Sequence, residues 1–177
     1  MEITTDIALK GQEWVQLIDK LADIFKTRTN YMLYMLCLAI GIHYDSIRTE
    51  DEMTENEGNN PSVPRNVVQN NDKGQIDFMF QAAILTTKHV EMDEEERLEL
   101  AFGEKAVVGK LSKIAFLTQF ANYGATVLLK QVGTNDIETM ENIKDFVASA
   151  IEGTDLCPPD DYPDDVLADD WITNNRY

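Results

Sequence analysis

The sequence contains few side chains whose type and spacing could support catalysis or metal binding. Its two histidines are His43, which follows an apolar run, and His89, which precedes Glu91 and Asp93. A metal site needs several converging ligands, and neither histidine has a second His or Cys at the spacing of ligands on a helix. The better pairing is His43 with Asp45, because a carboxylate can orient an imidazole. An enzyme that uses His43 or His89 is therefore a minority hypothesis.

Acidic and nucleophilic residues show no catalytic pattern either. The run from Asp93 to Glu96 resembles a cation site only superficially, because consecutive helical positions point in different directions. We interpret these acids as the solvated first turn of a helix, where the helix dipole favours negative charge. No serine lies in a Gly-x-Ser-x-Gly setting, and no glycine-rich phosphate-binding pattern occurs. The sequence thus predicts a protein that is not an enzyme and has no metal or cofactor.

Net charge is the most informative property of the composition. The chain has 15 Lys and Arg against 32 Asp and Glu, a formal net charge of −17. Affinity for phosphate arrays comes mainly from Lys and Arg. We therefore expect the isolated protein to bind neither nucleic acid nor a membrane nor a small molecule, and its partner to be a larger protein subunit with a basic surface. Lys110 and Lys113 share a helix face and are candidate nucleic-acid contacts only within a complex.

The C-terminal residues 154–177 form the densest acidic block, with seven acids and one base. Aromatic residues are interleaved with these acids, which a purely solvating tail does not require. Aromatic side chains supply interface energy, and carboxylates steer a basic partner. The candidate partner-binding residues are Tyr162, Asp164, Asp165, Asp169, Asp170, Trp171 and Tyr177. The alternative is that Trp171 and Ile172 fold back onto the protein's own helices.

Cysteine usage and hydropathy predict a cytoplasmic protein. Cys37 lies in an apolar run and Cys157 lies beside two prolines. We expect both as reduced thiols, and one disulfide between them is the alternative. The N-terminal residues lack the basic region and apolar stretch of a secretory signal. The longest apolar run, residues 31–42, is shorter than the roughly 20 residues needed to span a bilayer.

Apolar periodicity predicts an all-α protein, a single globular bundle of about five to six helices in residues 1–153, followed by the acidic tail. The predicted helices cover residues 12–26, 31–40, 76–87, 93–100, 106–132 and 137–151. Gly41 is expected as a left-handed C-cap, whereas Gly124 implies either a tightly packed neighbouring helix or a bend. Residues 133–136 are a stop-and-cap signal, and Ile137, Met140 and Phe146 are expected to pack inward. The helix that begins at Ile76 is expected to be largely buried.

Residues 45–75 form a polar insert with a different composition. They hold seven acids and three bases and show no apolar period. Loops of about 30 residues are uncommon in compact domains and are usually disordered or functional. We therefore expect this insert to be mobile and dispensable for folding. Residues 63–68 are its only segment that could dock in an extended form.

Three segments carry a resemblance to a known group of proteins. They are FKTRTNYMLYMLCLAIG (25–41), IDFMFQAAILTTK (76–88) and FLTQFANYGATVLL (116–129), arranged around the variable polar insert. This order resembles small helical proteins encoded with bacterial DNA phosphorothioation (Dnd) and related phage-defence systems. The resemblance implies an accessory component that works beside larger ATPase or nuclease subunits and has no catalytic residues of its own.

Two functional hypotheses follow. The leading one is a non-enzymatic accessory subunit of a bacterial anti-phage defence or DNA-transaction complex, acting through protein–protein interaction. The alternative is a phage-type acidic DNA-mimic inhibitor that occupies a basic nucleic-acid-binding groove. They differ in surface arrangement, because a mimic needs carboxylates in rows at phosphate-like spacing, whereas a subunit needs an apolar patch with local acid.

Overall fold

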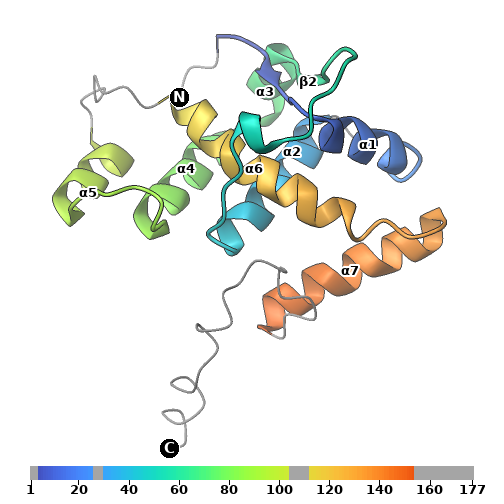
Figure 1. Cartoon of the computed structure of the whole chain (residues 1–177). Coiled ribbons are helices and arrows are strands. Elements are labelled where there is room, and N and C mark those ends of the chain that lie inside the picture. Colours follow the sequence, from blue (N-terminus) through green and yellow to red (C-terminus); the bar gives the residue numbers. More distant parts are fainter. Residues whose placement is uncertain (1–3, 26–29, 104–111, 154–177) are drawn as a thin grey trace, which may run out of the picture.

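A computed structural model describes residues 4–25, 30–103 and 112–153 and consists mainly of α-helices (Figure 1). The predicted all-α class is confirmed, with a single two-stranded antiparallel sheet in the described part of the chain. The elements in chain order are β1 (Ile7–Ala8), α1 (Gln12–Leu21), α2 (Asn30–His43), a 3-10 turn η1 (Glu50–Glu52), β2 (Ser62–Val63), α3 (Arg65–Asn71), α4 (Gln75–Thr86), α5 (Glu94–Phe102), α6 (Lys113–Leu129) and α7 (Asp136–Glu152).

The crossing of α2 and α6 forms the centre of the fold, and Figure 1 shows the two helices lying one across the other. A Cβ at Gly41 would lie 2.0 Å from the carbonyl oxygen of Phe120. A Cβ at Gly124 would lie 1.8 Å from the carbonyl oxygen of Cys37. The two backbones are therefore in direct contact at two points, one helical turn apart on each helix.

The structure agrees with one of the two explanations expected for Gly124 and contradicts the role expected for Gly41. Gly124 allows a neighbouring helix to pack tightly, which was one of the two expected explanations, and α6 continues through it. The C-cap prediction for Gly41 is wrong, because α2 continues to His43 and Gly41 does not have a positive φ. Gly41 is needed because only a residue without Cβ allows the backbone of α6 to approach this closely.

Helix α1 packs against α6 and is fixed by a buried hydrogen bond. Trp14 is fully buried, and its Nε1 donates to Oδ1 of Asn122 at 2.9 Å. The helix is shorter than predicted, since it ends at Leu21 and residues 22–25 form turns. Helix α6 is also shorter at its C-terminal end, and the predicted start at residue 106 lies outside the described residues.

Residues 45–75 do not form the mobile, structureless insert that the sequence predicts. Strand β2 pairs with β1, with Val63 opposite Ile7, and residues 65–71 form the helix α3. Met53, Val63 and Val68 are buried in the hydrophobic core. Met53 follows η1, Val63 lies in β2 and Val68 lies in α3, so these three residues show no period in the sequence although they share one core. The segment therefore packs along β1 and the start of α1 and forms part of the folded domain.

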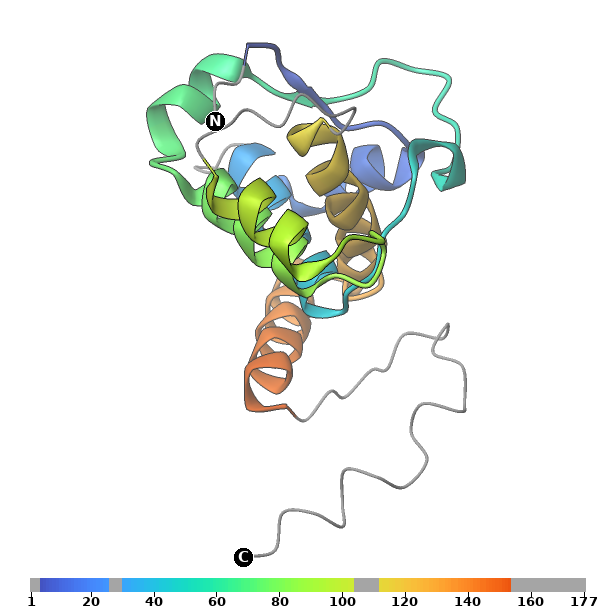
Figure 2. The same ribbon diagram turned by 90° about the vertical axis from the view of Figure 1, so that its left-hand side faces the viewer.

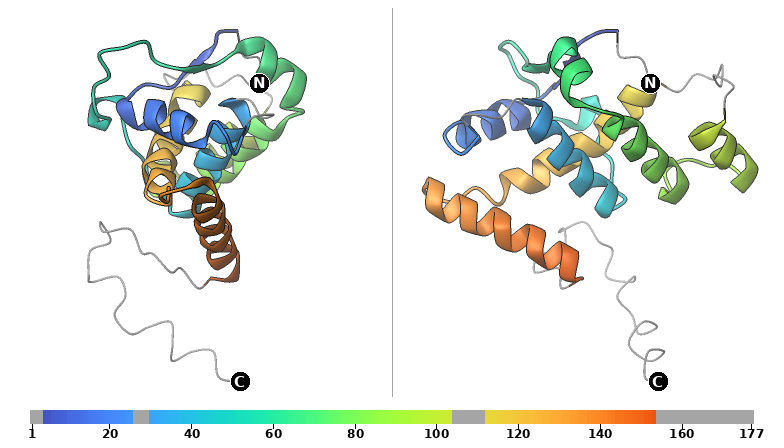
Figure 3. Two further views of the ribbon diagram at one scale, coloured as in Figure 1. Left: turned by 90° about the vertical axis from the view of Figure 1, so that its right-hand side faces the viewer. Right: turned by 180° about the vertical axis from the view of Figure 1, so that it is seen from behind.

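Helix α7 lies at the edge of the molecule, as Figures 2 and 3 show. Its predicted start is confirmed, because Oδ1 of Asn135 accepts a hydrogen bond from the backbone N–H of Glu138 at 3.0 Å. Phe146 packs inward as expected, with its ring centre 6.4 Å from that of Tyr44. Ile137 and Met140, which were expected to pack inward too, are exposed by 72% and 57%.

Candidate functional site

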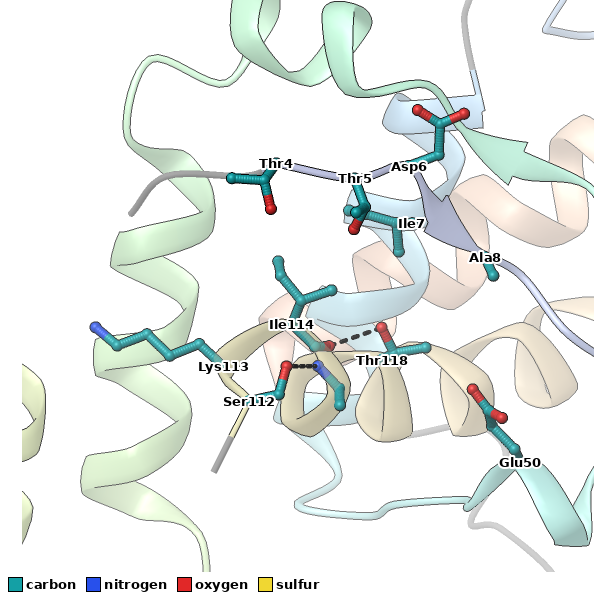
Figure 4. Close-up of a pocket in the computed structure, with 11 residues that line it drawn as sticks. Thr4, Thr5, Asp6, Ile7, Ala8, Glu50, Ser112, Lys113, Ile114 and Thr118 are labelled. Atoms are coloured by element: carbon teal, nitrogen blue, oxygen red, sulfur yellow. Dashed lines mark hydrogen bonds between the residues drawn. The ribbon is translucent and has the colours of Figure 1, made fainter. Parts of the chain in front are cut away.

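Most of the sequence-predicted site residues lie outside the part of the chain that the structure describes. Tyr162, Asp164, Asp165, Asp169, Asp170, Trp171 and Tyr177 belong to residues 154–177, and Lys110 belongs to residues 104–111. Lys113 is described. Its Nζ lies 4.5 Å from the centre of the Phe80 ring, and Figure 4 shows the side chain extending toward α4. This cation–π contact ties α6 to α4.

The histidines are arranged differently from the sequence interpretation, which favoured His43 with Asp45. His89 is the histidine hydrogen-bonded to Asp45, because its Nε2 lies 2.7 Å from the Asp45 carbonyl oxygen and donates to it. The Asp45 carboxylate accepts from the backbone N–H of Lys88 at 3.0 Å. His43 is the last residue of α2, with its ring edge against Tyr44. Asp45 thus connects the end of α2 to the residues after α4 through these two hydrogen bonds.

Cys37 is fully buried, and burial raises the pKa of its thiol.

Among the described residues, no three His, Cys, Asp or Glu side chains converge as metal ligands. In the same described part of the chain, none of the helices combines the length and apolar composition required to cross a membrane.

A pocket of about 420 Å³ lies between the N-terminal segment and the start of α6 (Figure 4). Three of its polar side chains, those of Asp6, Ser112 and Thr118, form hydrogen bonds within the protein. Ser112 Oγ accepts from the backbone N–H of Ala115, and Thr118 Oγ1 donates to the Ile114 carbonyl oxygen. Asp6 accepts from the backbone N–H of Arg65 on the other wall. These contacts cap and connect elements, and we assign no chemistry to this pocket.

A second pocket, of about 610 Å³, is bordered by the basic side chains Arg48, His89 and Lys130. The Arg48 guanidinium donates to Thr126 Oγ1 at 3.1 Å and lies 3.9 Å from a carboxylate oxygen of Glu13. The Glu52 side chain also borders this pocket. Because carboxylates offset its positive charge, we do not assign it as an anion site.

The strongest candidate is the surface of the hairpin formed by α4 and α5, in which α4 packs against α2 and α6 and α5 lies at the outer side of the molecule (Figure 1). Four large apolar side chains are exposed on this hairpin, contrary to the expectation that the first of its helices is largely buried. Residues four or seven positions apart share a helix face. These exposed side chains are Phe78 and Leu85 on α4 and Leu98 and Phe102 on α5.

Arg97 fixes the connection between the two helices. Its Nη1 donates to the carbonyl oxygens of Ile84 and Thr87, at 2.7 and 2.9 Å. Nη2 donates to Val90 at 2.5 Å, and Nε donates to Met92 at 3.3 Å. The last carbonyl groups of a helix lack intrahelical partners, and a cation is favourable there. Arg97 therefore fixes the position of α5 relative to α4.

The acids at the start of α5 divide into two groups. Asp93 and Glu96 form a capping box, in which each side chain accepts from the other's backbone N–H. Glu94, Glu95 and Glu99 are exposed and border a hollow of about 530 Å³ together with Leu98 and Phe102. We name the exposed side chains Phe78, Leu85, Glu94, Glu95, Leu98, Glu99 and Phe102 the hairpin surface.

Sequence reasoning treated this helix as a solvated acidic segment and missed its apolar residues. The signal in the sequence was the pair Leu98 and Phe102, which are one turn apart in a segment whose other residues are mostly acids.

Comparison of this chain with known proteins finds no relative. The chain matches no protein-family model, no curated protein and no solved structure.

Proposed function

We propose that this protein is a non-enzymatic accessory subunit that binds a larger protein through the hairpin surface. In line with the resemblance described above, its setting is a bacterial anti-phage defence or DNA-transaction complex in the cytoplasm, and its partner is an ATPase or nuclease subunit with a basic surface.

One observation carries this proposal. On α5, the hairpin surface places the exposed apolar side chains Leu98 and Phe102 around one hollow with the carboxylates of Glu94, Glu95 and Glu99, the arrangement expected of a subunit. Phe78 and Phe102 are 66% and 61% exposed. Large aromatic side chains are favoured at interface centres, whereas a DNA mimic has no use for them between its carboxylates.

The energetics of such a contact are favourable. Full burial of a Leu or Phe side chain contributes roughly 1.5–3 kcal/mol, before the costs of association are subtracted. Glu94, Glu95 and Glu99 at the rim raise the association rate with a basic partner, an effect that decreases with salt. Arg97 holds the hairpin in place, so that little conformational entropy is lost on binding.

The C-terminal tail is a second proposed contact, anchored by Trp171 and Tyr162 and steered by its aspartates. Trp171→Ala is expected to weaken partner binding by roughly 2 kcal/mol, as for a typical aromatic hot spot, with nearly unchanged thermal stability. A clear loss of stability with intact binding would instead show that Trp171 packs on the protein's own helices.

Affinity capture of the tagged full-length chain from the cells that encode it tests the proposal. The variant Leu98→Ser with Phe102→Ser removes the two apolar side chains that α5 contributes to the hairpin surface, and Met32→Ser, at an exposed apolar residue of α2, is the matched control. We expect a specific protein to be recovered with wild type and Met32→Ser but lost with the double variant. Equal recovery with all three would refute the role of this surface.

The DNA-mimic alternative predicts a different outcome of the same experiment. The captured protein would bind DNA, the chain would compete with DNA for it, and moderate salt would abolish recovery. The Leu98→Ser, Phe102→Ser variant would then bind as well as wild type, because carboxylates rather than apolar groups would make the contact.

A further inference from the structure

The outer side of α5 has a groove between two rows of side chains. Residues four positions apart form ridges along a helix, and the spaces between ridges are the grooves into which another helix packs. This groove is a hollow of about 530 Å³. Its borders are Glu94, Leu98 and Phe102 in one row and Glu95, Glu99 and Gly103 in the next. We name this hollow the apolar groove.

A second groove of about 530 Å³ lies on the other side of the row that contains Glu95 and Glu99. These two glutamates border both hollows. The apolar residues of the second groove are Met92 and Leu100, which are half-buried and pack against the core. Glu95 and Glu99 therefore form an acidic ridge between two partly apolar grooves.

The apolar groove is open on its outer side. Leu98 and Phe102 are exposed by 45% and 61%. The described residues that border the groove all belong to α5 and its C-terminal cap, so no other described element covers it. Single exposed apolar residues are ordinary, whereas apolar residues gathered in a groove with a charged rim indicate an interaction site.

The charge of α5 determines what can enter this groove. Glu94, Glu95 and Glu99 are exposed, and Arg97 is the only basic residue of the helix. The Arg97 guanidinium donates its hydrogen bonds to carbonyl groups of residues 84–92. Within α5, no cation is therefore directed to the exposed glutamates.

This charge argues against three possible occupants. A second copy of α5 would place glutamates against glutamates, and like charges across an interface are unfavourable. The chain's own residues 154–177 carry seven acids and one base. Nucleic acid would bring phosphates to the same carboxylates. A basic protein segment is the complementary occupant, and the spacing of the ridges fits a helix.

We infer that α5 binds a basic amphipathic helix of the partner. Aliphatic side chains one turn apart on that helix enter the apolar groove between Leu98 and Phe102 and the acidic ridge. Lys or Arg side chains in the adjoining row lie along Glu95 and Glu99. The inference rests on the function proposed above, and it specifies which part of the partner the hairpin surface recognises.

Three synthetic helical peptides of about 18 residues, about five turns, test this with the full-length protein. The first has Leu at every fourth position and Lys in both adjoining rows. The second has Glu in place of Lys, and the third keeps Lys but has Gln in place of Leu. The third measures the attraction of any basic peptide to a protein with a net charge of −17.

Fluorescence anisotropy should show that the first peptide binds at least about tenfold more tightly than either of the others. Binding of the first and third peptides with equal affinity would show that the apolar groove is not used. That result would overturn the inference, as would the absence of binding.

Charge variants identify the ridge. Glu95→Gln with Glu99→Gln should weaken the first peptide about tenfold. Glu141→Gln with Asp145→Asn is the matched control, because it removes two charges at exposed positions four residues apart on α7. It should change the affinity by less than about twofold. An equal loss with both variants would mean that the peptide responds only to net charge, which would overturn the inference.

Apolar variants identify the groove. Leu98→Ser with Phe102→Ser should weaken the first peptide about tenfold and leave the third nearly unchanged. Both side chains are exposed, so the melting temperature should stay close to wild type. Unchanged affinity for the first peptide would overturn the inference. So would tighter binding to Val107→Ser with Val108→Ser, because it would assign the groove to the chain's own residues 104–111.

The capture experiment described above separates this inference from the proposed function. Loss of the partner with Glu95→Gln, Glu99→Gln as well as with Leu98→Ser, Phe102→Ser would support both. Loss with the apolar variant alone would leave the function intact and overturn the basic helix as the recognised element. Recovery that none of the variants changes would refute the function and this partner together.

Discussion

Gly124 lies directly against the backbone of Cys37, with space for a hydrogen atom but not for a methyl group. The Cβ of any other residue at position 124 would lie 1.8 Å from the Cys37 carbonyl oxygen. The same relationship holds in reverse, because Gly41 on α2 faces the Phe120 carbonyl oxygen on α6. The two glycines therefore set the separation of the two central helices.

Gly124→Ala should destabilise the protein by about 1–3 kcal/mol, since the added methyl group forces the helices apart. Intrinsic helix propensity alone predicts the opposite sign, a gain of about 1 kcal/mol. Gly58→Ala is the control, because its Cβ would lie 3.7 Å from the nearest atom. Urea denaturation measures both, and a stabilised Gly124→Ala would show that the helices do not approach this closely.

Arg97→Gln should cost about 2 kcal/mol of stability, because it removes charge-assisted hydrogen bonds to several backbone carbonyl groups. Hydrogen exchange should accelerate most in residues 84–102. Lys88→Gln changes the net charge equally but leaves the backbone N–H of residue 88 bound to Asp45. If the two variants behave alike, Arg97 acts only through its charge.

Val63→Ala should lower the free energy of unfolding by about 2 kcal/mol, since Val63 is fully buried where β2 pairs with β1. Asn59→Ala, at an exposed position of the same segment, should be nearly neutral. The measurement is chemical denaturation of both variants. A neutral Val63→Ala would restore the sequence-based expectation that residues 45–75 are dispensable for folding.

Alkaline pH should destabilise the protein partly through Tyr34. Burial raises the pKa of Tyr34 from 10.0 to about 12 in the folded protein, and its hydrogen bond with Thr118 opposes this shift. The unfolded chain therefore loses the phenol proton first, and the stability contribution, complete below pH 10, is lost as pH rises toward 12.

Tyr34→Phe isolates this effect. Relative to its stability at pH 8, the variant should lose about 1 kcal/mol less than wild type on going to pH 11. Denaturation at several pH values provides the measurement, and parallel pH profiles for the two proteins would contradict the assignment.

Local signals in the sequence predicted the helices well, and signals that depend on distant partners did not. Asn135 and Asp93 were recognisable because a helix cap bonds to residues three positions away. Gly41 was misassigned because its role depends on α6, about 80 residues later. Met53, Val63 and Val68 were missed because one buried residue per short element leaves no periodicity.

The candidate site was predictable only in part. The acids of α5 and their place at a helix start follow from the sequence. The role of Arg97 does not, because its partners are carbonyl groups of a loop whose path depends on tertiary packing. The exposure of Phe78 and Phe102 also could not be predicted, since apolar pattern alone does not distinguish a core-facing side from an unpaired one.

The bond between Trp14 and Asn122 has a consequence during synthesis on the ribosome, since it joins residues 108 positions apart. At elongation rates of roughly 5–20 residues per second, roughly 5–20 s separate the emergence of the two residues. For that time the indole N–H of Trp14 lacks its native acceptor, and α1 is a short helix that cannot yet pack against α6. The hydrogen bond that fixes α1 against α6 can therefore form only after α6 has left the exit tunnel.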